Sequence, residues 1–232
     1  MKFYLEKIRG INLRTSCLMI AGFEGDRESF HRDKRRAEAI FREFGAIALG
    51  AGPGRAFQEG KYDFPYLRDF LLDREVMADV SETCTVWSKL LPLYEASRGA
   101  IQAAIVAEGT PGVVGCHISH SYHAGASLYF TFGFVAKKGD ELGQYLRIKK
   151  AAEDSFLDNG ATLSHHHAVG YEHLPWLQRD ISAAGLTAIE ALKSGLDPKG
   201  VMNPGKLARG FGFEEWGLTN SAEPASRATG SE

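Results

Sequence analysis

The stretch VVGCHISHSYHAGASLYFTFGFVA, residues 113–136, is rich in β-branched and aromatic residues and has Ala124-Gly125 near its centre. This composition predicts two strands that meet at Ala124-Gly125. Strands joined by so short a connection run antiparallel. Long antiparallel strands backed by helices indicate an α+β fold rather than a doubly wound parallel sheet.

The segments on either side complete this unit. Residues 76–86, VMADVSETCTV, are expected to form a strand with imperfect alternation. Residues 88–108 have a strong helical pattern that stops before Gly109-Thr110-Pro111-Gly112, and 140–158 predict a charged amphipathic helix. The fold class expected is therefore α+β, an antiparallel sheet with helices packed on one face and ferredoxin-like elements.

The rest of the chain adds shorter predicted elements. They are a strand over 15–23, a helix from Asp26 to Phe44 with Asp26 as its cap, a strand over 46–52, a helix opened by Pro65 over 65–73, and a last helix from Pro175 to Gly195. Residues 217–232 are small and polar, with one proline, and are expected to be disordered. We expect one domain over 1–216 and a tail over 217–232.

Composition excludes several classes of protein. The 232 residues carry 27 basic and 29 acidic side chains, so the charge favours neither nucleic acid nor an anionic membrane as a partner. Cys17, Cys84 and Cys116 are odd in number and far apart, which favours a reducing compartment over a disulfide framework. No signal peptide or apolar run of 18 residues is visible. We expect a cytoplasmic protein. Whether it associates peripherally with a membrane is left open.

Histidine is concentrated in one part of the sequence. Seven of the eight histidines are His117, His120, His123, His165, His166, His167 and His173. Recognisable metal-ligand spacings such as H-E-x-x-H or C-x-x-C are absent, so acid–base chemistry explains the triplet 165–167 better than a metal does. Adjacent imidazoles repel each other's charge, which favours a neutral base. A solvated histidine-rich loop is the structural alternative.

Three other features have both a structural and a functional interpretation. GAGPG at 50–54 lacks the third glycine of a dinucleotide loop, which would fall on Arg55, so it is expected to be a surface loop. Tyr129 lies in an aromatic strand and, from spacing alone, is a core residue with a satisfied phenol. Arg68 has apolar neighbours and needs an anion, either a carboxylate such as Asp69 or a ligand phosphate or carboxylate.

Taken together, several stretches resemble the C-terminal half of FAD-linked oxidases of the vanillyl-alcohol-oxidase type. Among these oxidases, the resemblance is to the alkylglycerone-phosphate synthases. The stretches are GFEGDRE (22–28), YLRDFLLD (66–73), SETCTVW (81–87), CHISHSYHAGASLYFTF (116–132), LSHHHAVG (163–170) and LDPKGVMNPGKL (196–207). They occur in family order from about residue 3 to 212. The serine–triple-histidine motif is the specific one, and the last stretch supports only the superfamily.

The resemblance implies the cap and catalytic domain of a two-domain flavoenzyme. Such an enzyme exchanges the acyl chain of acyl-dihydroxyacetone phosphate for a fatty alcohol in ether lipid synthesis, with no net redox change at the FAD. It also implies roles for individual residues. Arg68 binds the substrate phosphate, Tyr129 and His165, His166 and His167 are catalytic, Asn203 contacts the cofactor, and no residue binds metal. The triplet and Tyr129 are then expected to share one face of the domain.

The sequence departs from the pattern of this family in some respects. Animal-type synthases have Arg and Asp where this chain has His117 and His123, so the substrate can differ. No FAD-binding half is recognisable, so we expect the FAD to be held by another domain of the full-length enzyme or by a partner chain. Whether the protein forms a homodimer is left open. Alternatives are FAD-dependent oxidation of a small hydroxy acid, and a non-catalytic α+β module that binds a partner or a metal through its histidines.

Overall fold

The computed structural model describes residue 12 and residues 16–63 and 65–207. The expected polar tail, 217–232, lies outside these residues. The chain divides into two compact units, Met1–Leu67 and Arg68–Glu232, and each is described by itself. No helix in the described part is long and apolar enough to cross a bilayer. The three cysteines are free.

The first unit is helical in its described part. It contains α1 (Arg27–Glu43), α2 (Gly52–Gly60) and the start of α3 (Pro65–Leu72). The expected cap of α1 is confirmed, because the Asp26 side chain accepts hydrogen bonds from the backbone N–H of Glu28 and Ser29 at 2.9 Å. The helix opened by Pro65 is also confirmed.

Two predictions in this unit are wrong, and a third is correct only in part. Residues 16–23 and 46–50 form no strand. A short apolar run becomes a strand only where a partner strand accepts its hydrogen bonds, and Leu18 and Met19 are instead exposed. The GAGPG stretch is only partly a loop, since Gly52 begins α2 and Pro53 lies in its first turn, where a missing N–H does no harm.

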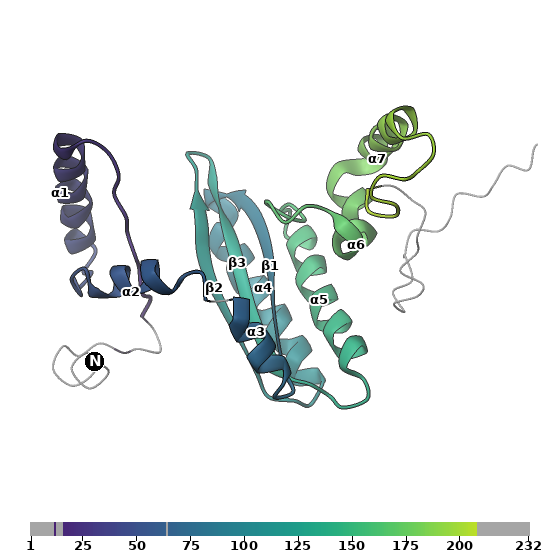
Figure 1. Cartoon of the computed structure of the whole chain (residues 1–232), viewed down its shortest axis with the longest axis horizontal. Coiled ribbons are helices and arrows are strands. Elements are labelled where there is room, and N and C mark those ends of the chain that lie inside the picture. Colours follow the sequence, from purple (N-terminus) through teal and green to yellow (C-terminus); the bar gives the residue numbers. More distant parts are fainter. Residues whose placement is uncertain (1–11, 13–15, 64, 208–232) are drawn as a thin grey trace, which may run out of the picture. The chain divides into compact units, whose positions relative to one another are not determined.

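The second unit contains the predicted sheet. Its elements are β1 (Val76–Val86), α4 (Trp87–Ala107), β2 (Gly112–Ser121), β3 (Gly125–Val135), α5 (Glu141–Asp158), α6 (Gly170–His173), the 3-10 turn Leu174–Trp176 and α7 (Leu177–Leu196). The strands lie in the order β1-β3-β2, and β3 is antiparallel to both neighbours (Figure 1). The strand pair, β1, α4 and α5 are confirmed. The last helix starts two residues later than expected, because Pro175 lies in the 3-10 turn before it.

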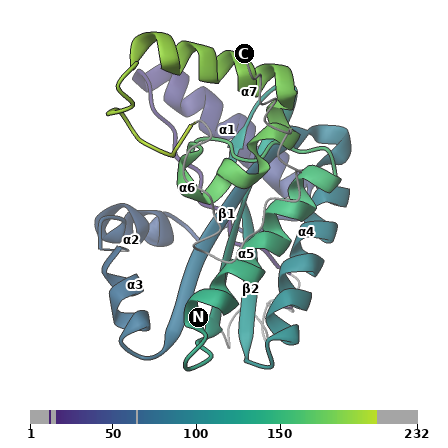
Figure 2. The same ribbon diagram turned by 90° about the vertical axis from the view of Figure 1, so that its right-hand side faces the viewer.

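The two faces of the sheet differ because side chains alternate along β3. Phe130, Phe132 and Phe134 are fully buried against α4 and α5, which lie along the same face (Figure 2). Leu93, Ile101, Ile105, Ile148, Ala152 and Phe156 complete this core from the two helices. Tyr129 and Thr131 point to the opposite face, where β2 presents the exposed His117. One strand thus supplies the core and the second, polar face.

The segment after α5 returns along the free edge of β1. The backbone N–H of Thr162 donates to the carbonyl of Cys84 at 3.1 Å, and the hydroxyl of Thr83 donates to the carbonyl of Thr162 at 2.5 Å. The segment therefore covers part of an edge that would otherwise present unpaired backbone groups. These bonds also deliver the chain to the triple-histidine loop, Ser164–Ala168.

A buried polar cluster lies between β1, α5 and α6. The ammonium of Lys149 lies 3.5 Å from a carboxylate oxygen of Asp79, donates to the carbonyl of Val80 at 2.5 Å, and pairs with Glu172. Glu153, fully buried, accepts a hydrogen bond from Ser81 at 3.1 Å. With several carboxyl groups around one ammonium, burial raises the pKa of Glu153 to about 8, against the opposing effect of Lys149. Burial therefore favours the protonated form of Glu153.

Burial of Glu153 predicts a stability that falls as pH rises. Between the unfolded pKa of 4.5 and the folded pKa of about 8, the folded protein holds one more proton than the unfolded chain. Its unfolding free energy should therefore decrease with pH in this window, by up to about 1.4 kcal/mol per pH unit, and Glu153→Gln should flatten the profile. Urea unfolding from pH 5 to pH 9 measures both slopes.

The matched control is Glu95→Gln, which removes an exposed carboxylate on α4. This variant should keep the wild-type slope. Equal slopes in the wild type and in Glu153→Gln would show that Glu153 is ionised in the folded protein.

Candidate active site

The triple-histidine loop lies beside Tyr129. The rings of Tyr129 and His167 are nearly perpendicular, with their centroids 5.6 Å apart. On the other side of Tyr129 the ring of His117, which is its cross-strand partner on β2, is 5.1 Å away. The structure thus brings together the tyrosine and the triplet, as expected, on the sheet face that α4 and α5 do not cover.

Glu82 on β1 holds the loop in place. Its side chain is fully buried, and the oxygen Oε1 accepts hydrogen bonds from three consecutive backbone N–H groups: His165 at 3.1 Å, His167 at 3.0 Å, and His166 between them. Three successive N–H groups that converge on one oxygen form an anion-binding nest. The buried carboxylate therefore determines the backbone path of the triplet.

The electrostatic balance at Glu82 favours its ionised form. Burial by itself would raise the pKa of Glu82, but the backbone hydrogen bonds from His166 and His167 and the nearby imidazole charges outweigh it and lower the pKa. The second oxygen, Oε2, lies 2.8 Å from Nδ1 of His166. It accepts no hydrogen bond of regular geometry from the described residues.

Tyr129 and His167 are both neutral in this environment. Burial raises the pKa of Tyr129, and the negative charges of Glu82 and Asp79 raise it further. Burial lowers the pKa of His167, against the opposing effect of Glu82, and the positive charge of His166 lowers it further. At neutral pH the pair thus consists of a phenol that can donate a proton and an imidazole that can accept one.

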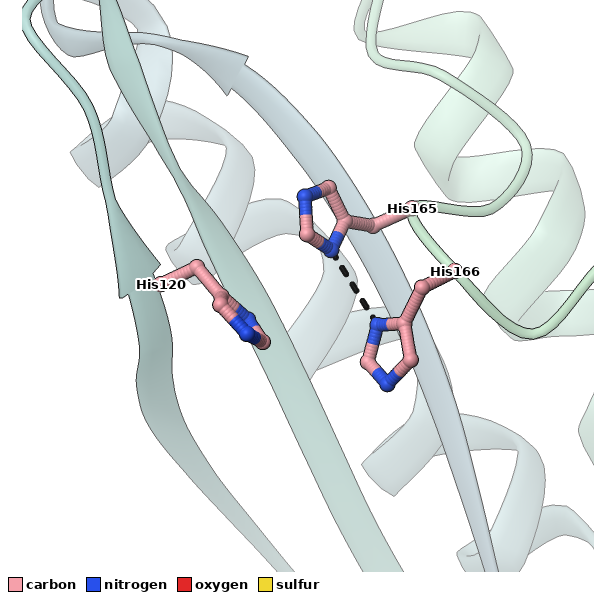
Figure 3. Close-up of side chains that lie close together, drawn as sticks. All are labelled: His120, His165 and His166. Atoms are coloured by element: carbon pink, nitrogen blue, oxygen red, sulfur yellow. Dashed lines mark hydrogen bonds between the residues drawn. The ribbon is translucent and has the colours of Figure 1, made fainter.

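The rings of His165 and His166 lie close to His120 on β2. Their Nδ1 atoms are 3.1 Å apart, and the ring of His120 lies opposite both (Figure 3). The other ring nitrogen of His165, Nε2, is 2.9 Å from the hydroxyl of Tyr122. One imidazole of the triplet therefore contacts Tyr129, and the other two contact His120.

Arg68 and Asn203 lie apart from this group. Arg68 is exposed, and no carboxylate of the described part of the chain pairs with it. It is close enough to the half-buried phenol of Tyr145, which donates to Asp79, to have a small electrostatic effect on it. Asn203 is exposed in a turn at φ +45°, where its carbonyl accepts from the N–H of Lys206. Among described residues neither contacts Tyr129 or the triplet, so their roles stay predictions.

Glu82 was not among the predicted site residues, although it lies in the stretch SETCTVW. A charged residue in the middle of a strand, with Ser81 and Thr83 on either side, was the available signal. Glutamate is almost never fully buried unless it is paired. Its partners are backbone groups 83 to 85 positions later in the chain, which no local pattern reveals.

Loss of the carboxylate at position 82 should loosen the loop. In Glu82→Ala the three N–H groups lose their acceptor, which we expect to lower the unfolding free energy by about 2 kcal/mol and to speed amide exchange at residues 165–167 by at least about 10-fold. Denaturant unfolding and hydrogen-exchange mass spectrometry measure the two effects.

Glu108→Gln provides the control, since that carboxylate binds Arg147 with two hydrogen bonds and has no contact with the loop. Exchange at 165–167 should be unchanged in this variant. Wild-type exchange at 165–167 in Glu82→Ala would mean that the nest does not hold the loop.

Comparisons with known proteins agree on one family. The chain is 38% identical over 206 residues to the alkyldihydroxyacetonephosphate synthase of Trypanosoma brucei brucei, covering 89% of this chain and 34% of that protein. The synthase of Dictyostelium discoideum is also 38% identical, over 208 residues, with the same coverage. The chain therefore spans about a third of the length of these relatives.

Solved structures give the same result. A structure described as alkyldihydroxyacetonephosphate synthase superposes with a TM-score of 0.68 at 31% identity, covering 88% of this chain and 34% of that one. Residues 2–207 match the family described as "FAD linked oxidases, C-terminal domain", which confirms the predicted fold class and FAD as the cofactor of the family. The chain belongs to this family of C-terminal domains of FAD-linked enzymes.

Proposed function

We propose that this chain is the cap and catalytic domain of an FAD-dependent enzyme of the alkyldihydroxyacetonephosphate synthase type. Such an enzyme exchanges the acyl chain of acyl-dihydroxyacetone phosphate for a fatty alcohol. The observation that carries the proposal is the pairing of Tyr129 with His167, centroids 5.6 Å apart, on a loop held by a buried carboxylate. The 38% identity to two synthases supports the substrate class.

The residues present can perform the proton transfers that the exchange requires. A neutral imidazole at His167 accepts a proton from the carbon beside the carbonyl. The phenol of Tyr129 donates its proton to the departing carboxylate, and the phenolate that remains takes a proton from the incoming alcohol, which restores the phenol. Because Glu82 fixes the loop backbone, both groups are held in position before the substrate arrives.

Arg68 is the proposed ligand of the substrate phosphate. A guanidinium binds phosphate through two parallel hydrogen bonds. Its exposure, and the fact that no carboxylate of the described residues pairs with it, leave these donors available. Binding there would anchor the head group while Tyr129 and His167 act on the reacting carbons.

The residues on the uncovered sheet face fit a flavin. His117, Tyr129 and His167 present N–H and O–H groups beside Gly115, which has no side chain and leaves its strand accessible. Asn203 is a further proposed contact. When bound, the flavin supplies the reactive ring system next to the substrate.

We propose that the FAD is held by another domain of the same polypeptide or by a partner chain. The chain's span of about a third of its relatives supports this arrangement. The three free cysteines accord with a reducing compartment such as the cytoplasm.

Replacement of the two proton-transfer groups tests the proposal. In the FAD-containing assembled enzyme, His167→Asn and Tyr129→Phe should each lower kcat by about 10²- to 10⁴-fold, the usual contribution of a general acid or base. Mass spectrometry of alkyl-dihydroxyacetone phosphate formed from the acyl substrate and hexadecanol measures the rate.

His123→Asn is the matched control, because His123 is exposed in the same hairpin and lies outside the site. It should keep the wild-type rate. Wild-type activity in His167→Asn and Tyr129→Phe would refute the assigned roles. Reduction of an artificial electron acceptor by a small hydroxy acid, without ether formation, would instead identify a hydroxy-acid oxidase.

Arg68→Ala should separate binding from stability. Because Arg68 has no carboxylate partner among the described residues, its loss should hardly change the melting temperature of the protein. In the assembled enzyme the same change should lower kcat/KM by an amount equivalent to about 2–4 kcal/mol, and lysine should restore it only in part. Thermal melts and kinetics on the same variant measure both effects.

Arg147→Ala is the opposite control, since the guanidinium of Arg147 already binds Glu108 and Asp140. It should lower stability by about 0.5–1 kcal/mol and leave kcat/KM unchanged. A lower melting temperature for Arg68→Ala with unchanged kcat/KM would make Arg68 a structural residue.

A further inference from the structure

Two imidazoles of the triplet and one from β2 form a separate group. The nitrogen atoms that His120, His165 and His166 can offer to a metal all lie within 4.8 Å of one another. The ring of His120 lies 4.9 Å from that of His165 and 5.4 Å from that of His166, and Figure 3 shows the strand and the loop bringing the three rings together. Segments more than forty residues apart in the chain thus supply one cluster.

One pair of these nitrogens has nearly the spacing of metal ligands. The Nδ1 atoms of His165 and His166 are 3.1 Å apart. In a tetrahedral zinc site with Zn–N bonds of about 2.0–2.1 Å, ligand nitrogens are separated by roughly 3.3–3.4 Å. These two Nδ1 atoms share one hydrogen bond, and a cation bound to both rings would take the place of the proton between them.

The remaining ring nitrogens have polar partners that orient the rings. Nε2 of His165 lies 2.9 Å from the hydroxyl of Tyr122, and Nδ1 of His120 lies 3.2 Å from the hydroxyl of Ser119. A cation would then bind Nε2 of His120 and the Nδ1 atoms of His165 and His166, which are hydrogen-bonded to each other. Metal-binding histidines almost always have such a partner on the second nitrogen.

A buried negative charge faces the same place. Oε2 of Glu82 lies 2.8 Å from Nδ1 of His166 and 3.9 Å from Nδ1 of His165. It accepts no hydrogen bond of regular geometry from the described residues, although its side chain is fully buried. A cation bound between the imidazoles would balance the charge of a buried carboxylate oxygen in this position.

We propose that His120, His165 and His166 bind one divalent transition-metal cation, with Zn²⁺ as the first candidate and Glu82 as the charge that balances it. Imidazole is a preferred ligand of zinc and of its neighbours in the first transition row. His120 and His166 are exposed, so at least one coordination position faces solvent. His167 stays at Tyr129, and the site therefore adds to the proposed function without removing its base.

The other clusters suit a metal less well. Glu153, Glu172 and His173 also converge, but the ammonium of Lys149 already occupies that group as its cation. Glu82, His166 and His167 converge too, yet the ring of His167 packs against Tyr129. The group with His120 is the one in which two rings have an orienting hydroxyl.

Calorimetric titration with ZnCl₂ tests the site. The chain is purified, freed of any histidine tag and treated with a chelator, and neither flavin nor activity is required. We expect one Zn²⁺ per chain, and His120→Ala and His166→Ala should each weaken binding by at least about 10-fold, because loss of even an orienting partner weakens metal binding by 10- to 100-fold. CoCl₂ should give the visible absorption bands of tetrahedral cobalt.

His123→Ala is the matched control and should bind Zn²⁺ with wild-type affinity. Thermal melts confirm that each variant is folded. If only one of His120→Ala and His166→Ala is folded, that variant alone is enough for the test. Wild-type affinity in a folded ligand variant, or an equal loss in His123→Ala, would overturn the site. The assay contains no flavin and no substrate. Its result can therefore refute the metal site without refuting the proposed reaction, and loss of the proposed reaction would not refute the metal site.

Discussion

The carboxylate of Glu82 is the contact on which the geometry of the site depends. It is buried in the middle of β1, and three consecutive N–H groups of the loop converge on its Oε1 atom. A buried charge without such donors would be costly, and a loop without such an acceptor would have no defined path. Each therefore stabilises the other. The imidazoles of the loop are arranged by a residue that need not take part in the chemistry.

The period of a strand explains how one sheet carries both a core and a site. Along β3 the odd and even positions point to opposite faces, so Phe130 and Phe132 pack on α4 and α5 while Tyr129 faces the loop. The same alternation on β1 sends Ser81 and Thr83 to one side and Glu82 to the other. A shift of one residue in register would exchange core and site together.

The triplet also divides its side chains by direction. Because the loop backbone curves around one oxygen, successive rings leave it at different angles, and His167 reaches Tyr129 while His165 and His166 reach His120. This division lets one short motif serve an acid–base pair and a separate nitrogen cluster. Three adjacent histidines in an extended strand would alternate between faces instead.

The sequence alone determined the sheet, its helices and the family. The apolar and β-branched pattern of 113–136, the stop signals at 109–112 and the serine–triple-histidine motif are local features that need no knowledge of distant contacts. Where the pattern was short and had no partner, as over 15–23 and 46–52, it predicted strands that do not form in the described residues of these stretches.

Only the tertiary structure decided how the histidines are used. Glu82 meets backbone groups 83 to 85 positions away, and His120 faces two rings from the loop after α5. Such contacts depend on the register of β1 with β3 and on the return of the chain along the edge of β1, which composition and spacing do not encode. Burial and convergence are properties of the packed chain, so the buried carboxylate and its nest became visible only in three dimensions.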